Sequence, residues 1–183
     1  DGALVAWGRQ GSNLNVPALP PGVTYVQAAG GMWFGAAVRS DGNLVAWGDN
    51  RFGQINVPPL PPGVRYVEVA AGDYHTVARR SDGRVVCWGW NVDGQCNVPS
   101  LPTGVGFAQV ACSGGQALAV LTDGNAISFG ADTFMPALPA GLTWREVGAG
   151  DMFALARRSD GAVLAWGDNR SGSCSVPSLP AGV

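Results

Sequence analysis

The chain has 183 residues, of which 46% are hydrophobic and only 13% are charged. This composition supplies enough apolar side chains for a core, and the low charge argues against a disordered chain. Gly, Pro or a charged residue interrupts every apolar run, so no segment is predicted to span a membrane. The net charge of −2 gives no electrostatic reason to bind nucleic acid or an anionic membrane.

The sequence is built from repeats of about 40 residues. Asp-Gly dipeptides begin near residues 1, 41, 82, 123 and 160. In four of these copies the dipeptide starts the pattern Asp-Gly-x-x-x-x-Trp-Gly, and a Val-Pro pair and a Leu-Pro-x-Gly corner follow. A period of this length indicates a chain of similar supersecondary units that stack on one another.

Each repeat is predicted to form short β-strands. Residues 64–71 and 76–80 are β-branched runs, and Ser81-Asp82-Gly83 is a tight hairpin signal. No window shows sustained helical periodicity, so we expect essentially no helix. Three or four strands per repeat are typical of a β-propeller blade, whereas β-solenoid coils are usually shorter. We therefore predict an all-β chain, with residues 1–183 forming a single β-propeller segment of about four and a half blades.

The repeat motif resembles that of the regulator of chromosome condensation family. The resemblance rests on residues 70–78 (Ala-Ala-Gly-Asp-Tyr-His-Thr-Val-Ala), the Ser-Asp-Gly turn and residues 88–95. The short form of the repeat, with its Val-Pro pair, is similar to that of the bacterial β-lactamase inhibitory protein II and of bacterial and algal repeat arrays. The resemblance implies a seven-bladed ring, which needs roughly 280 residues. We expect the chain to be part of such a ring, with open arcs that associate through edge strands as the alternative.

Residue types that recur at one repeat position are expected to be structural. Trp7, Trp47, Trp88 and Trp166 share a position, which favours a role in the blade core. The cysteines stand where other copies have small apolar residues, and none forms a Cys-x-x-Cys pair. We therefore expect buried cysteine thiols and neither a metal site nor a disulfide.

Recurring polar residues are also interpreted as structural. Asn50, Asn91 and Asn169 are expected to form turns, so the glycosylation sequon at residues 169–171 is interpreted as coincidental. Recurring arginines before the Asp-Gly turn either pair with a neighbouring Asp or lie on a solvated face. These arginines are Arg39, Arg80 and Arg158.

The loops that follow Ala-Ala-Gly differ between copies, which makes them the candidate binding region. Equivalent loops of a propeller gather on one rim, and aromatic and Met side chains beside Asp are typical of protein-binding surfaces. In the similar inhibitor, aromatic residues of matching loops contact the target enzyme. The candidate binding residues are Met32, Trp33, Phe34, Asp73, Tyr74, His75, Asp151, Met152 and Phe153. For His75 and Phe153, plugging the blade edge is at least as well supported as binding.

The loops that follow Trp-Gly are expected on the opposite rim. Trp90 does not recur there and is a second candidate contact residue. In the fourth copy this loop is about four residues shorter, which predicts a notch lined by Phe134 and Met135.

Nothing in the sequence indicates an enzyme. There is one histidine, and neither a Gly-x-Ser-x-Gly elbow nor a P-loop, so no catalytic residue, metal or cofactor is predicted. We expect a non-enzymatic protein–protein interaction propeller, acting as an inhibitor, scaffold or assembly subunit. Its partner is expected to be another protein or a second copy bound through open blade edges. The alternatives are a carbohydrate-binding propeller and a nucleotide exchange factor for a small GTPase.

Overall fold

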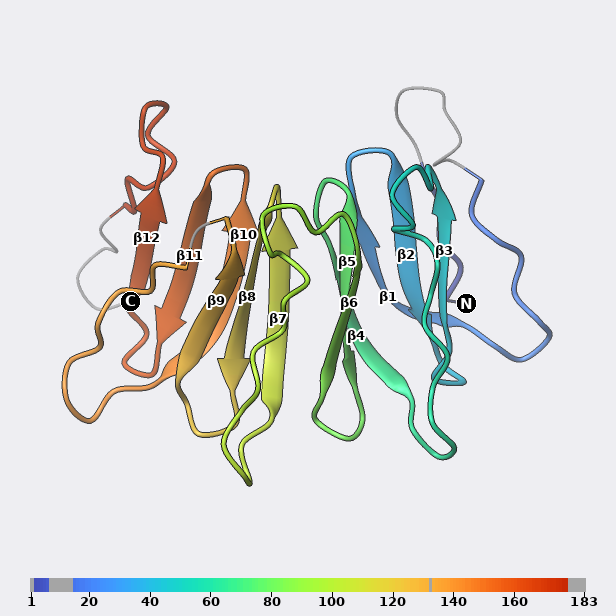
Figure 1. Ribbon diagram of the computed structural model, residues 1–183, viewed down its shortest axis with the longest axis horizontal. Helices are drawn as coiled ribbons and strands as arrows, with labels where there is room; N and C mark the ends of the chain where they lie inside the picture. Colours follow the sequence, from blue (N-terminus) through green and yellow to red (C-terminus); the bar gives the residue numbers. More distant parts are fainter. Residues whose placement is uncertain (1, 7–14, 132, 178–183) are drawn as a thin grey trace.

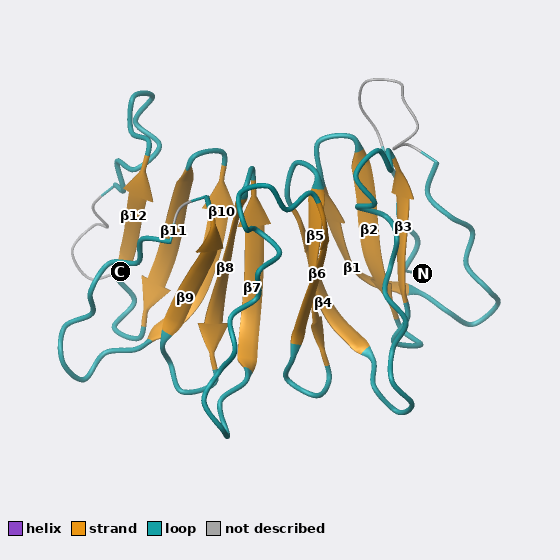
Figure 2. Ribbon diagram, in the orientation of Figure 1, coloured by secondary structure: helices purple, strands orange, loops and turns teal. Residues whose placement is uncertain are grey.

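The computed structural model describes residues 2–6, 15–131 and 133–177, which form twelve strands in four three-stranded antiparallel sheets (Figures 1 and 2). The strands are β1 (Tyr25–Gly30), β2 (Phe34–Arg39), β3 (Leu44–Gly48), β4 (Tyr66–Ala71), β5 (His75–Arg80), β6 (Val85–Gly89), β7 (Phe107–Ser113), β8 (Gln116–Leu121), β9 (Ala126–Gly130), β10 (Trp144–Gly150), β11 (Phe153–Arg158) and β12 (Val163–Gly167). The prediction of an all-β chain of repeated blades is confirmed, with three strands in each blade.

The four sheets follow one another in a row, in chain order (Figure 1). Within each sheet the middle strand pairs with both of its neighbours, so each blade is an up-down-up meander. Because β3 runs antiparallel to β2, with Gly48 opposite Phe34, the end of β3 returns to the edge that holds the β1–β2 hairpin.

We call this edge the upper rim. It carries the hairpins at residues 31–33, 72–74, 114–115 and 151–152 and the loops that follow β3, β6, β9 and β12. The Asp-Gly turns lie at the opposite edge, the lower rim. The prediction that the loops after Trp-Gly lie on the rim opposite the Ala-Ala-Gly loops is therefore wrong, because both sets share the upper rim.

The glycine of each Trp-Gly pair is required by the backbone. At Gly48 and Gly89 the φ angle is 107°, in the region that favours glycine. A Cβ at these positions would lie 2.6 Å from the carbonyl oxygen of Trp33 and 2.5 Å from that of Tyr74. The close approach of each third strand to its hairpin therefore explains why this glycine recurs in every blade.

At the lower rim, the recurring arginines pair with the aspartate two residues further on. The three ion pairs are Arg39–Asp41, Arg80–Asp82 and Arg158–Asp160. The pairing alternative for these arginines is therefore confirmed.

The hydrophobic core lies in the three junctions between neighbouring sheets. In the first junction, Ala36 and Val38 of β2 pack with Tyr66 and Val69 of β4, and Trp88 packs against the same cluster. The second and third junctions repeat this arrangement. Phe129 in the second junction and Trp166 in the third occupy the repeat position that Trp88 has in the first. The predicted core role holds for Trp88 and Trp166, while Trp7 lies outside the described residues.

One polar contact also recurs at every junction. The side-chain oxygen of Gln27 accepts a hydrogen bond from the backbone N–H of Val69 at 2.7 Å. Glu68 accepts the equivalent bond from Val110, and Gln109 accepts it from Val147. We call this contact the junction clamp, because a side chain of one blade satisfies a backbone donor of the next blade.

Two of the four cysteines form a disulfide, which corrects the prediction of buried thiols for Cys87 and Cys96. Cys87 on β6 is bonded to Cys96 in the loop that follows, with the Cα atoms 4.9 Å apart. The equivalent positions are Ala46 and Ile55 in the first blade, so only the second blade has cysteine at both. The two cysteines are nine positions apart in sequence, and their contact depends on how the loop folds back onto the strand. Cys112 and Cys174 are free.

Candidate protein-binding surface

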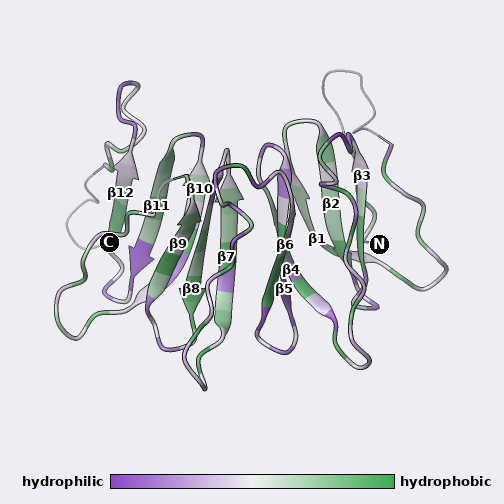
Figure 3. Ribbon diagram, viewed as in Figure 1, coloured by the Kyte–Doolittle hydropathy of each residue, from purple (hydrophilic) through white to green (hydrophobic). Residues whose placement is uncertain are grey.

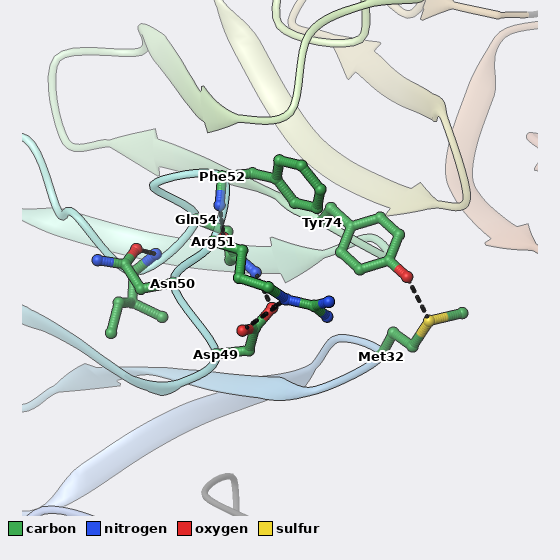
Figure 4. Close-up of polar contacts among 8 residues, drawn as sticks. Met32, Asp49, Asn50, Arg51, Phe52, Gln54 and Tyr74 are labelled. Atoms are coloured by element: carbon green, nitrogen blue, oxygen red, sulfur yellow. Dashed lines mark hydrogen bonds and ion pairs between the residues drawn. The ribbon is translucent and has the colours of Figure 1, made fainter.

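Three loops of the upper rim bring together an aromatic cluster formed by Phe52, Tyr74 and Trp90. The ring of Phe52 lies 5.1 Å from that of Tyr74 and 4.4 Å from that of Trp90, both at 72°. Such edge-to-face contacts are favourable for aromatic pairs. The Tyr74 hydroxyl donates a hydrogen bond to Met32 Sδ at 3.0 Å (Figure 4). The surface therefore joins residues of the first and second blades.

Recurring polar residues hold the loops of this cluster in place. Asn50 Oδ1 accepts a hydrogen bond from the backbone N–H of Ile55, and Asn91 Oδ1 accepts one from Cys96. The side chains of Gln54 and Gln95 are buried beneath the loops, where each accepts a backbone hydrogen bond at 2.9 Å. The predicted turn role of the asparagines is confirmed. These contacts fix the loops before any partner arrives.

Apolar side chains are exposed along the same rim. Met32 is 47% exposed, Trp33 is 41% exposed, Phe52 is 36% exposed and Met152 is 68% exposed. Figure 3 shows that the strands below are mostly apolar, whereas the loops are mixed. Single exposed apolar residues are ordinary, but several on one rim indicate an interaction surface.

Two of the predicted binding residues are instead buried plugs. Phe34 and His75 are 1% and 0% exposed, so neither offers a surface to a partner. Each ring lies over a glycine, Gly31 or Gly72, whose added Cβ would collide with it. Phe153, at the equivalent position of the fourth blade, is half-buried over its own glycine. The Ala-Ala-Gly motif therefore ends in glycine because the plug needs that space.

The buried plug of the second blade is a histidine whose titration is perturbed. Burial without compensating contacts lowers the pKa of His75 to about 4, because the charged imidazolium loses its hydration. Both ring nitrogens are buried, and among the described residues neither has a hydrogen-bond partner. His75 is therefore neutral at physiological pH.

The two described arginines of the upper rim are both paired with aspartates of their own loops. Arg51 Nε lies 3.0 Å from Asp49 Oδ1, and Arg170 pairs with Asp168 in the fourth blade. Hydrogen bonds from Arg170 lower the pKa of Asp168 to about 2. Their guanidinium charges are therefore balanced within the loops.

Two adjacent hollows open on the upper rim beside the aromatic cluster. The smaller has a volume of about 340 Å³ and is lined in part by Phe52, Tyr74 and Trp90. The larger, of about 590 Å³, extends to the fourth blade, where Met152 and Phe153 line it. The hollows share one wall, formed by Asp73, Asp93, Gly114 and Gly115.

The sequence explains why these hollows exist. The third hairpin has Gly114-Gly115 where the second has Asp73-Tyr74, so side chains that fill the rim elsewhere are replaced by hydrogen atoms. The shortened loop after β9 adds to the opening, because Ala131 lines the larger hollow. The prediction that Phe134 and Met135 line a notch here is wrong: neither lines either of these two hollows, and Met135 packs into the third junction.

The described residues provide neither a metal centre nor a membrane helix. No group of three or more His, Cys, Asp or Glu side chains among them is arranged to hold a metal ion. The described part of the chain also has no helix long and apolar enough to cross a bilayer.

The chain matches the family model "Regulator of chromosome condensation (RCC1) repeat" over residues 26–54, 66–95 and 144–173. Each segment covers the three strands of one blade, except that the first begins one residue after Tyr25, where β1 starts. No curated protein sequence matches the chain.

Several solved structures share the fold. Human WBSCR16 matches with a TM-score of 0.71 and 19% identity, over 84% of this chain and 50% of that one. Yeast RCC1 (Prp20), bound to Kap60, matches with a TM-score of 0.70 and 20% identity, over 89% and 47%. The ectodomain of the Physcomitrella patens receptor kinase CR4 matches with a TM-score of 0.61 and 22% identity, over 87% and 42%.

At these identities the likeness concerns the fold alone, and the chain spans about half the length of these solved relatives. The four three-stranded sheets of this chain have the backbone fold of part of these relatives, and the repeat model matches three of the four blades by sequence. Three of the four blades of this chain therefore match the RCC1 repeat family, and the four blades together have the fold of part of an RCC1-like propeller.

Proposed function

We propose that this chain is a non-enzymatic protein-binding propeller segment that holds its partner on the upper rim. The observation that carries the proposal is the aromatic cluster of Phe52, Tyr74 and Trp90, which three loops assemble from two blades. Aromatic side chains supply a large contact area at low entropic cost and dominate many protein interfaces.

The division between fixed and variable residues on the rim supports this proposal. Within each loop after Trp-Gly, the Asn and Gln that form internal hydrogen bonds recur in the first and second blades. The side chains that point away from this framework change, from Phe52 in one blade to Asp93 in the next. A rigid scaffold that presents changing side chains is typical of a binding surface.

Two finer interpretations belong to the same proposal. The ring is proposed to have seven blades, since the solved relatives are about twice as long as this chain. The bacterial β-lactamase inhibitory protein II, whose repeats resemble these in their short form, is the proposed model for how a partner binds to the upper rim. Yeast RCC1 (Prp20), which shares this fold, is itself found bound to another protein, Kap60.

The experiment that tests the proposal compares partner binding by rim variants. Trp33→Ala combined with Tyr74→Ala removes apolar contact area from the upper rim, and Trp90→Ala removes it separately. The matched control is Arg65→Ala, an exposed position at the lower rim. Proteins captured from the source organism by the unmodified chain are purified and titrated against each variant by calorimetry.

We expect the upper-rim variants to lose binding by tenfold or more while their melting temperatures stay within about 2 °C of the unmodified chain. The control should bind normally. Equal binding by all variants, or a large fall in melting temperature for the rim variants alone, would remove the upper rim as the binding surface.

A further inference from the structure

We propose that the smaller hollow of the upper rim receives a basic side chain, arginine or lysine, from a segment of the partner protein. This inference rests on the proposed function and specifies the partner's chemistry. Three features of the hollow carry it: its carboxylates, its aromatic wall and its glycine floor.

The carboxylates around the hollow lack a balancing cation. Asp73 and Asp93 line it, and within the described part of the chain neither is in an ion pair. Its one guanidinium, that of Arg51, donates through Nε to both oxygens of Asp49 at 3.0 Å. The hollow therefore carries net negative charge, which a basic partner group complements.

The aromatic cluster forms the facing wall. Tyr74 and Trp90 are half-buried and contact Phe52 on either side, so the cluster is held in place by its own packing. An arginine or lysine side chain combines an apolar stem with a cationic head, and aromatic faces attract such cations. A wall of this kind beside two carboxylates matches both parts of that side chain.

The glycines of the third hairpin keep the space open. A Cβ at Gly115 would lie 3.3 Å from Asp93 Oδ2, and one at Gly114 would lie 3.7 Å from Asp151 Oδ1. Carboxylates from the second and fourth blades thus approach the same two residues, where there are no side chains to separate them from a ligand. The hollow therefore offers carboxylates that can pair with a cationic side chain, and it leaves room for that side chain to enter.

The test uses random peptides displayed on phage, which need no knowledge of the natural partner. The library is selected on the unmodified chain. Each selected peptide is then synthesised and titrated against Asp73→Asn combined with Asp93→Asn, which keeps side-chain shape while removing both charges. Glu146→Gln is the control, since Glu146 is an exposed carboxylate on strand β10.

We expect the selected peptides to contain arginine or lysine beside apolar residues. The double Asn variant should weaken them about tenfold, in line with the loss of a charge-assisted hydrogen bond, and should abolish the salt dependence of binding. The control should bind unchanged. Peptides without basic residues, no recovered peptides, or equal affinity for the double variant would each overturn the inference.

The outcome also separates this inference from the proposed function. Peptides or partners that depend on Tyr74 and Trp90 but not on the two aspartates would leave the upper rim as the binding surface and remove only the basic partner. Binders that depend on neither would remove both. The melting temperatures of all variants show whether a loss of binding results from a loss of folding.

Discussion

The junctions between blades and the outward face of the fourth blade are built from the same repeat positions, yet they differ in burial. Ala36, Val77 and Leu118 occupy one position in the first three blades, and each is 0% exposed because the next blade covers it. Leu155 occupies that position in the fourth blade and is 39% exposed. The junction clamp differs in the same way: the Glu68 side chain is 15% exposed and its counterpart Glu146 is 58% exposed.

This difference shows that the repeat specifies an interface rather than a self-contained unit. Every blade carries an apolar face and a clamp residue, and both are satisfied only when another blade lies against them. Stability in such an array depends on contacts between neighbours as much as on each repeat. Matched substitutions at equivalent positions can therefore measure what a neighbouring blade contributes.

The largest contrast should come from replacing the leucine at this repeat position with alanine, once in a junction and once on the outward face. Leu118→Ala should lower the free energy of unfolding by about 3 kcal/mol, because it leaves a cavity in a packed junction. Leu155→Ala should cost less than about 1 kcal/mol, since the side chain already contacts solvent. Urea unfolding monitored by tryptophan fluorescence measures both. Equal losses would mean that the outward face is covered in solution.

A second contrast concerns the plugs and is revealed by acid. The pKa of His75 is lowered from its ordinary value to about 4, so the folded state binds its proton less readily than the unfolded state. His75 therefore does not lower the free energy of unfolding above pH 6.5. Its titration lowers that free energy by about 3 kcal/mol as the pH drops from 6.5 to about 4.

The matched control for this plug is His75→Phe, which copies Phe34 and Phe153 of other blades. The variant should lose that part of the pH dependence between 6.5 and 4 while keeping its stability at pH 7. Melting curves collected across this range provide the measurement. An unchanged pH profile in the variant would show that His75 is not the titrating group.

The third contrast is between the disulfide-linked loop of the second blade and the unlinked loop of the fourth. Reduction of Cys87–Cys96 should cost about 2–3 kcal/mol, the entropy of closing a short loop in the unfolded chain. Cys87→Ala combined with Cys96→Ile recreates the pair present in the first blade. That variant should melt at one temperature with or without reductant. A shift on reduction in this variant would place the effect elsewhere.

The smallest contrast should come from the junction clamp. Glu68→Ala leaves the N–H of Val110 without its acceptor and also removes the ion pair with Arg79, and it should cost about 1–2 kcal/mol. Glu68→Gln preserves an acceptor, as Gln27 and Gln109 do naturally, and should cost much less. Glu146→Ala should change stability by less than about 0.5 kcal/mol, because only an exposed ion pair with Arg157 is lost. Chemical denaturation of the three variants side by side decides the order.

The fold could be predicted from the sequence because its signals are local and repeated. The Asp-Gly turns, the Trp-Gly pairs and the β-rich runs each determine a short stretch of backbone, and each signal recurs in at least four copies. The structural role of Asn50 was predictable for the same reason, since its hydrogen bonds stay within one loop.

The surface was less predictable because it depends on contacts between distant residues. The sequence analysis does not single out Phe52, because its loop and the hairpin of Tyr74 are predicted on opposite rims, where the two rings could not meet. Counting strands would have corrected this, because the ends of the first and third strands of a meander meet at one edge. The disulfide and the hollow at Gly114-Gly115 depend on how loops pack in space, which the spacing of residues does not reveal.

The direction of the junction clamp has a consequence for how such arrays lengthen. In each described pair the acceptor side chain belongs to the earlier blade and the backbone donor to the later one. A duplicated repeat thus carries a side-chain acceptor for the blade that follows it. To the blade before it, the repeat offers a backbone N–H, which does not depend on side-chain identity. Gene duplication could insert a blade between two others without a compensating substitution at either new boundary.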